Sequence, residues 1–288
     1  NRKLLPFWWG DIRYTLPPFI ALCDPDYAGR EYYRDTVSAF SYEQVTKKVP
    51  FTAVRRGYFR IGSAELATPD YFFRWRMLAR APQSAQLYVF PSRKDAGRLE
   101  PDLRRITGEI LTRRLMVEDP FQFRGIRDYA PFDSLKKINW KATARTGETK
   151  VNEYSATVSQ QAVLLLDLDR SSDWNPEELR EAVLRIGACL ADRLIAAGVP
   201  VGLCSNACDV VTGKRSALPC RGGAEQLDAL NRCLARMDTG RIAQPFPEVL
   251  AGLAGGSRGP QYVLVSCDGS RPIREAAARL RTGGAGLQ

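Results

Sequence analysis

The chain has 288 residues, with 42 lysines and arginines against 32 aspartates and glutamates, and it contains no histidine. Its length predicts two domains, and the missing histidine excludes sites that need an imidazole, such as a Ser-His-Asp triad or a His-ligated zinc. Any catalysis would depend on carboxylates, Lys, Arg, Ser, Cys, Tyr or a metal ion held by oxygen atoms. The basic excess is concentrated in residues 1–160, and it suits nucleic acid, an anionic membrane or plain solvation.

Residues 1–92 are predicted to form a small β-sandwich domain of the immunoglobulin or fibronectin type. Short runs rich in aromatic and β-branched residues are separated by turn residues, and they lie at 14–16, 37–42, 49–54, 58–62 and 86–90. Several short strands at this spacing are typical of a sandwich. Residues 93–123 are rich in charge, and we expect a connector with a short helix there.

The C-terminal part, residues 124–288, is predicted to form an α/β domain. The apolar run 162–166 is typical of a strand buried on both faces, and the helix after it begins at Asn175 and Pro176 and ends at Gly198. Further strands are expected at 199–204 and 261–266, with helices after them at 224–237 and 273–280. This alternation predicts a doubly wound sheet of the Rossmann type.

Two of the predicted strands end in acidic residues. Asp167 and Asp169 follow the first, with Ser171 close behind, and Asp268 follows the last. Because the carboxyl ends of parallel strands meet at one edge of a sheet, we expect these side chains to converge. Such a cluster of oxygen atoms suits Mg²⁺. Asp and Ser at strand ends also commonly cap the following turns and helices, so the residues alone leave both interpretations open.

The first of these strand ends resembles the metal-ion-dependent adhesion site of the von Willebrand factor type A domain. Asp167 and Ser171 match its first aspartate and its last serine, and Asp268 matches its later aspartate. Asp169 stands in place of the middle serine, and Arg221-Gly222-Gly223 lies where a threonine is expected. The resemblance implies a von Willebrand factor A-like fold with a degenerate site, in which the three aspartates and the serine would hold magnesium.

Residues 124–147 carry a more specific pattern. An R-x-Y element leads to an aspartate and then to the sequence I-N-W-K-A-T-A-R at 138–145. This segment resembles the hallmark of the bacterial and archaeal family catalogued as domain of unknown function fifty-eight, with Phe132 in place of that family's glycine. Weaker matches at 55–62 and 69–72 extend the resemblance over most of the chain. The candidate motif residues are Arg127, Tyr129, Asp133, Trp140, Lys141 and Arg145.

Within this motif, Asp133 is predicted to cap a short helix that ends at Gly147. The apolar face of that helix would consist of Leu135, Ile138 and Ala142. Trp140, flanked by cations, is typical of an interface hot spot. The alternative is that Trp140 packs into a core while Arg127 and Arg145 pair with neighbouring carboxylates.

The family resemblance also implies a function. Family members are typically anchored by transmembrane helices ahead of a cytoplasmic globular region, and they associate with MoxR-type AAA+ ATPases. We therefore expect a non-enzymatic adaptor at the cytoplasmic face of a membrane, with such an ATPase as its partner. No stretch of the chain approaches the roughly 18–20 consecutive apolar residues of a membrane span, so we expect an anchor ahead of Asn1.

Two other functions stay open. A magnesium-dependent hydrolase or phosphoryl-transfer enzyme could use Asp167, Asp169 and Asp268, because an aspartyl nucleophile needs only a carboxylate and a metal ion. No basic motif for gripping a phosphate follows those strands, however. Nucleic-acid binding through the basic front half is the third possibility, but the aromatic residues there alternate as in a sandwich core and form no stacking platform.

Overall fold

The computed structural model describes residues 2–17, 19–23, 32–70, 72, 74–82, 85–93, 100–116, 123–131, 133–154, 161–169, 176–253 and 260–282. The chain divides into two compact units. Unit 1 consists of Asn1–Ser92 together with Asp209–Gly213 and Asn231–Asp238, and unit 2 consists of the remainder. Residues 93–123, the expected connector, are thus grouped with unit 2.

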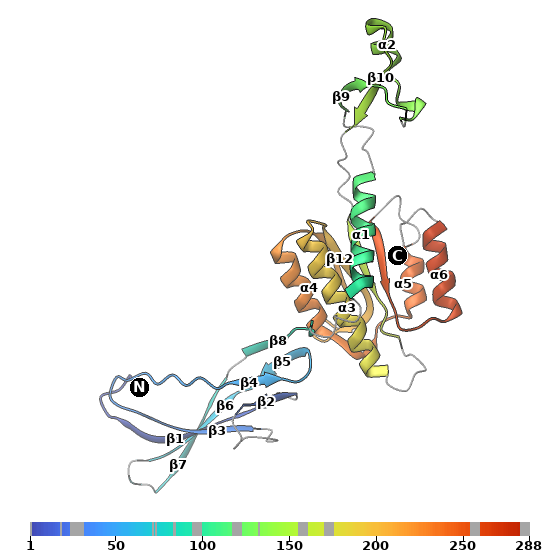
Figure 1. The fold of residues 1–288 in the computed structure, drawn as a ribbon. Coiled ribbons are helices and arrows are strands. Elements are labelled where there is room, and N and C mark those ends of the chain that lie inside the picture. Colours follow the sequence, from blue (N-terminus) through green and yellow to red (C-terminus); the bar gives the residue numbers. More distant parts are fainter. Residues whose placement is uncertain are drawn as a thin grey trace. The chain divides into compact units, whose positions relative to one another are not determined.

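Unit 1 is built from antiparallel strands (Figure 1). Its largest sheet has the strand order β3-β1-β6-β7, and two smaller sheets pair β2 with β4 and β5 with β8. The strands are β1 (Phe7–Thr15), β2 (Ile20–Leu22), β3 (Tyr32–Ala39), β4 (Phe51–Ala53), β5 (Gly57–Ile61), β6 (Ala64–Pro69), β7 (Arg76–Ala81) and β8 (Ala85–Val89). Along β3, exposed and half-buried residues alternate, because successive side chains of a strand point to opposite faces.

The centre of the largest sheet holds a buried carboxylate, that of Asp11 on β1. It accepts hydrogen bonds from Arg34 Nη2 at 2.8 Å and from Thr36 Oγ1 at 3.1 Å, and the hydrogen bond from Arg34 is the largest cause that lowers the pKa of Asp11. The Arg76 guanidinium lies 3.6 Å from the same carboxylate. By contrast, no large aliphatic or aromatic side chain is fully buried in the described residues up to Ser92. Strand pairing and ion pairing therefore order this sheet more than apolar burial does.

Unit 2 contains a mixed sheet whose central strands are parallel. β11 (Ala162–Leu166) lies between β12 (Val201–Asp209) and β15 (Gln261–Val265), and Leu166 is in register with both Ser205 and Val265. β13 (Arg215–Arg221) runs antiparallel to β12 at the edge, and β14 (Met237–Ile242) also pairs with β12. The continuous apolar sequence of β11 fits this central position, since both of its faces are covered.

Helices cover the two faces of this sheet (Figure 1). They are α1 (Glu100–Met116), α3 (Pro176–Ala196), α4 (Ala224–Arg236), α5 (Phe246–Leu253) and α6 (Arg271–Thr282). On one face, Leu165 packs with Phe246 of α5 and Leu280 of α6. On the other, a Cβ at Gly187 of α3 would lie 3.0 Å from the Leu166 side chain, so this glycine allows the helix to approach β11 closely. α1 packs against α3.

The regular elements predicted for this part of the chain are confirmed. The strands at 162–166 and 261–266 have nearly the expected bounds, and α3 begins at Pro176 and ends just before Gly198. α1 has 17 residues and is longer than the short helix expected in the connector. Ion pairs from Arg104 to Glu100 and from Arg105 to Glu109, each four residues apart, support its length. No helix in the described ranges is long and apolar enough to cross a membrane.

The motif segment, residues 123–154, forms an antiparallel pair of strands, β9 (Phe123–Asp128) and β10 (Lys150–Tyr154), with two short helical pieces between them. The predicted single helix capped by Asp133 is wrong. A 3-10 turn at Leu135–Lys137 ends at Ile138, whose extended backbone bridges to Val151, and α2 (Trp140–Thr146) begins anew after it. The side chain of Asn139 caps α2 by accepting a hydrogen bond from Ala142 N at 3.0 Å. Gly147 ends α2 in the left-handed conformation (φ 76°), as predicted.

Candidate functional site

The structure brings the three predicted aspartates to one edge of the unit 2 sheet. Asp167 directly follows β11, and its backbone N–H donates to Val265 O at 3.0 Å, which aligns the ends of β11 and β15. Asp169 and Asp268 line a hollow of about 550 Å³ at this edge, together with residues 242–245. We call Asp167, Asp169 and Asp268 together the carboxylate rim. Ser171, the fourth predicted ligand, lies outside the described residues.

Asp167 is the buried member of the carboxylate rim, with 3% of its surface exposed. Its carboxylate accepts hydrogen bonds from Asn206 Nδ2 at 3.2 Å, from the backbone N–H of Asp169 at 2.9 Å and from Ser266 Oγ at 2.6 Å. Burial raises the pKa of Asp167 above its ordinary value, and the negative charges of Asp169 and Asp268 act in the same direction. The hydrogen bonds oppose this shift only in part.

Asn206 is a side chain at the carboxylate rim that the sequence pattern did not reveal. It is fully buried at the point where β12 extends beyond β11, and its amide oxygen accepts from Leu168 N at 2.9 Å while its amide nitrogen donates to Asp167. A buried amide is stable only when its polar atoms are paired in this way. The sequence did contain a signal for this role, because the polar pair Ser205-Asn206 interrupts a mostly apolar strand. Ser205 is in register with Leu166, and Asn206 lies one residue beyond it.

The other two aspartates of the rim each hold the start of a helix. Asp169 Oδ2 accepts from the backbone N–H of Phe246, the first residue of α5, at 2.9 Å. Asp268 Oδ1 accepts from the backbone N–H of Ser270, directly before α6, at 2.8 Å. Carboxylates at helix N-termini satisfy amide groups that have no partner inside the helix. The capping role left open by the sequence is therefore present at both positions.

A magnesium ion would need about six oxygen ligands in an octahedron. Both carboxylate oxygens of Asp167 already accept hydrogen bonds. In the described part of the chain, Asp169 Oδ1 and Asp268 Oδ2 have no hydrogen-bond donor. An ion at the rim would therefore have these two oxygen atoms and water as its ligands. No group of three or more acidic or cysteine side chains among the described residues is arranged to hold a metal, so the residues described here do not form a three-carboxylate centre.

A second candidate site lies in the motif segment. Arg127 and Asp133 form a bidentate pair, with N–O distances of 2.6 and 2.7 Å, and Asp133 also accepts from Ala130 N at 2.9 Å. The Arg127 guanidinium is the main cause that holds the pKa of Asp133 down at about 2. Paired planar groups of this kind fix geometry as well as charge. Of the alternative in which Arg127 and Arg145 pair with carboxylates, the structure shows the Arg127 pair.

Trp140 opens α2 and is 70% exposed. The alternative in which Trp140 packs into a core is therefore wrong. Lys141 and Arg145 on the same short helix are also exposed, while Tyr129 is half-buried. Lys150, rather than Arg145, pairs with Asp128 and Glu148. The motif segment thus presents a tryptophan and two cations to solvent from a helix whose two ends are fixed by Asn139 and Gly147.

Comparison with known protein families identifies part of the chain. The model of the family described as "Protein of unknown function DUF58" matches residues 125–249. The predicted resemblance to this family is confirmed over these residues, which include the motif segment from Gly125 onward and the sheet from β11 to β14. No curated protein and no solved structure matches the chain.

Proposed function

We propose that this chain is a non-enzymatic adaptor whose motif segment docks onto a MoxR-type AAA+ ATPase at the cytoplasmic face of a membrane. The observation that carries the proposal is Trp140, which lies 70% exposed on a capped helix beside exposed cations. Tryptophan and arginine dominate the energetics of protein interfaces, and here an exposed tryptophan lies on the same short helix as two exposed cations, Lys141 and Arg145.

The surroundings of Trp140 support a preformed interface. The bidentate Arg127–Asp133 pair fixes the turn ahead of α2, and Asn139 donates through Nδ2 to Asn152 Oδ1 at 2.7 Å, which joins α2 to β10. A side chain held on an ordered scaffold loses less entropy when it binds. The basic residues Lys136, Lys141 and Arg145 are exposed in the same segment, so the complementary surface on the partner should be acidic.

The fold of unit 2 is, we infer, that of a von Willebrand factor A-like domain. The strand order β13-β12-β11-β15 corresponds to 3-2-1-4 when these strands are numbered within the unit and β14 is set aside. This is the order of a doubly wound sheet up to its fourth strand. The helices on both faces and the acidic carboxyl edge agree with the same inference. For unit 1 we propose a sandwich-like arrangement of its antiparallel sheets.

The carboxylate rim supports a binding role more than a catalytic one. Asp169 and Asp268 each use one oxygen atom to cap a helix, and both oxygens of Asp167 accept hydrogen bonds from within the protein. An aspartyl nucleophile needs an oxygen atom that is free to attack, which the buried Asp167 lacks, whereas Asp169 and Asp268 each keep one such atom among the described residues. Magnesium at the rim would depend on the oxygen atoms of Asp169 and Asp268 that accept no hydrogen bond in the described part of the chain, with water as its other ligands.

Substitution of Trp140 tests the adaptor proposal. In a pull-down or titration with a purified MoxR-type ATPase, Trp140→Ala should weaken binding by roughly 30-fold or more, the effect of an interface hot spot. Its matched control is Trp75→Ala, because Trp75 is equally exposed, at 76%, but lies in unit 1. Absence of binding by the unmodified chain would refute the partner, and equal binding by both variants would refute the interface.

The enzymatic alternative is tested in parallel. Phosphatase activity on generic phosphoesters is measured with and without Mg²⁺, for the unmodified chain and for an Asp169→Ala, Asp268→Ala double variant. Turnover that depends on both the ion and these carboxylates would replace the adaptor proposal by a hydrolase.

A further inference from the structure

Unit 1 exposes a group of large apolar side chains at one end of its largest sheet. They lie at the start of the chain, in β1 and in the β6–β7 hairpin, and are Leu4, Leu5, Trp8, Phe72, Trp75 and Met77. Single exposed apolar residues are common on protein surfaces, whereas a contiguous group marks an interaction site. We call this group the hairpin-tip patch.

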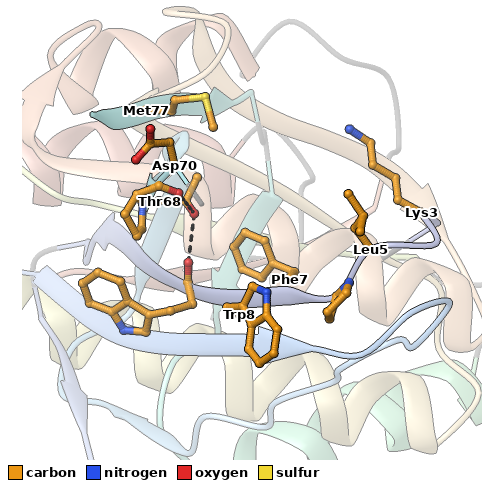
Figure 2. Close-up of a pocket in the computed structure, with 10 residues that line it drawn as sticks. Lys3, Leu5, Phe7, Trp8, Thr68, Asp70 and Met77 are labelled. Carbon is orange, nitrogen blue, oxygen red and sulfur yellow. Dashed lines mark hydrogen bonds between the residues drawn. The ribbon is translucent and has the colours of Figure 1, made fainter. Parts of the chain in front are cut away.

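A hollow connects the two parts of the hairpin-tip patch. Leu5, Trp8 and Met77 line it, and so does Asp70, whose carboxylate accepts from the backbone N–H of Trp75. The hollow has a volume of about 780 Å³ and is lined by residues from the start of the chain and from the β6–β7 hairpin. Figure 2 shows Lys3 and Leu5 on one side of it and Asp70 and Met77 on the other. Thr68 Oγ1 donates to the backbone oxygen of Trp9 at 2.9 Å and joins the two segments (Figure 2).

Basic side chains surround this apolar surface. Exposed cations lie on both of its segments, at Arg2, Lys3 and Arg74. Arg76 and Arg80 face the carboxylates of Asp11 and Glu65 and so add little net charge, and the carboxylate of Asp70 lines the hollow itself. Asp70 accepts from the backbone N–H groups of Arg74 and Trp75 at 2.7 and 3.2 Å, and Glu65 pairs with Arg80 at 3.0 Å. The charge balance of the hairpin-tip patch is therefore positive.

We propose that the hairpin-tip patch binds the anionic surface of a lipid bilayer. Tryptophan and phenylalanine favour the zone between headgroups and acyl chains, and arginine reaches from there to lipid phosphates. The Arg74 guanidinium lies 5.0 Å from the centre of the Phe72 ring, so a cation and an aromatic ring are already placed together at the loop. A protein partner would need an acidic surface and an apolar surface side by side. An anionic bilayer has negative headgroups directly above its apolar acyl chains, so it matches both features of the patch.

The absence of a buried apolar core in the described residues up to Ser92 agrees with this occupant. Strand pairing and the Asp11 ion cluster hold the sheet, so its large apolar side chains stay exposed and can contact lipid. The proposal adds a contact to the membrane location proposed above, and it uses none of the observations on the motif segment. The two proposals can therefore fail separately.

The test uses the full chain and sucrose-loaded vesicles of two compositions, phosphatidylcholine alone and two parts phosphatidylcholine to one part phosphatidylglycerol. The unmodified chain should sediment with the anionic vesicles and shift its tryptophan emission to the blue. The double variant Phe72→Ser, Trp75→Ser should bind at least tenfold more weakly, and Arg74→Gln should cost about fivefold, the contribution of one cation near an anionic surface. High salt should weaken binding of the unmodified chain.

The matched control is Trp140→Ser, which removes an equally exposed tryptophan from unit 2 and should leave vesicle binding unchanged. Circular dichroism should show that every variant remains folded, since all the altered side chains are exposed. Failure of the unmodified chain to bind anionic vesicles would overturn the proposal. So would equal loss in Trp140→Ser, or self-association that Phe72→Ser, Trp75→Ser abolishes without any vesicle binding, which would make a second copy the occupant. ATPase binding is measured separately with Trp140→Ala and its control Trp75→Ala, so the adaptor proposal is tested independently of vesicle binding.

Discussion

Substitution of Asp167 distinguishes hydrogen bonding from charge at the carboxylate rim. In Asp167→Asn, the amide oxygen can still accept from Asn206 and from the Asp169 N–H, and the new NH₂ group can donate to the Ser266 hydroxyl, whose proton can turn elsewhere. In Asp167→Ala, all three donors lose their acceptor. The two variants therefore differ in hydrogen bonding while both remove the charge.

The expected magnitudes follow from the burial of this site. A buried donor left without an acceptor costs about 1–3 kcal/mol, and water can reach part of the group because Ser266 is only half-buried. We expect Asp167→Ala to lower the free energy of unfolding by about 2–4 kcal/mol. Asp167→Asn should change it by no more than about 1 kcal/mol, since it also removes an unfavourable buried charge.

The pH dependence gives an independent check. Because the pKa of Asp167 is raised in the folded chain, the folded state holds this proton at pH values where the unfolded chain has released it. The contribution of Asp167 to stability is therefore greatest below the ordinary pKa of aspartate and falls as pH rises through the raised pKa of the folded state. Asp167→Asn cannot ionise, so the difference in unfolding free energy between it and the unmodified chain should follow this course with pH.

Guanidinium unfolding at a series of pH values, followed by circular dichroism, measures both effects. The reasoning is refuted if Asp167→Asn is as unstable as Asp167→Ala, because hydrogen bonding would then not be the cause. It is also refuted if the difference between Asp167→Asn and the unmodified chain does not change with pH.

Two further predictions concern packing and acid stability. Gly202→Ala should destabilise unit 2 by about 1–3 kcal/mol, because the new Cβ would lie 2.7 Å from Cys220 Sγ, whereas Gly252→Ala has open space and should be neutral or slightly stabilising in guanidinium unfolding. At pH values above the ordinary aspartate pKa, the Arg127–Asp133 pair should keep the motif segment ordered. This effect should be lost as the pH falls toward about 2, the lowered pKa of Asp133, because the carboxylate is then protonated. Amide NMR signals of the segment should show this acid transition, and Asp133→Asn should abolish it.

The sequence predicted the elements of unit 2 whose signals are local. β11 was recognisable because a central parallel strand is apolar throughout, and α3 because its cap residues lie within its own sequence. α5 was missed because it is short and because the cap of its first N–H comes from Asp169, far away in the chain. β13 and β14 are partly exposed strands with mixed polarity, so they lack the apolar run that identified their neighbours.

At the candidate site, spacing predicted which residues meet but not how they bond. The convergence of the aspartates follows from strand polarity alone, whereas the role of Asn206 depends on the register of β12 against β11. The break between the two helical pieces of the motif segment depends on the bridge of Ile138 to Val151. The exposure of Trp140 could not be predicted either, because a tryptophan on a short helix fits a core and an interface equally well.

Binding of a cation at the carboxylate rim should also change the pKa of Asp167. The charges of Asp169 and Asp268 contribute to the raised pKa of Asp167, so a cation bound to their free oxygen atoms would lower that pKa and flatten the pH dependence of stability. The same flattening should occur in Asp268→Asn without any ion. If added Mg²⁺ leaves the pH dependence unchanged while Asp268→Asn alters it, the rim does not hold the ion, and its carboxylates act through capping alone.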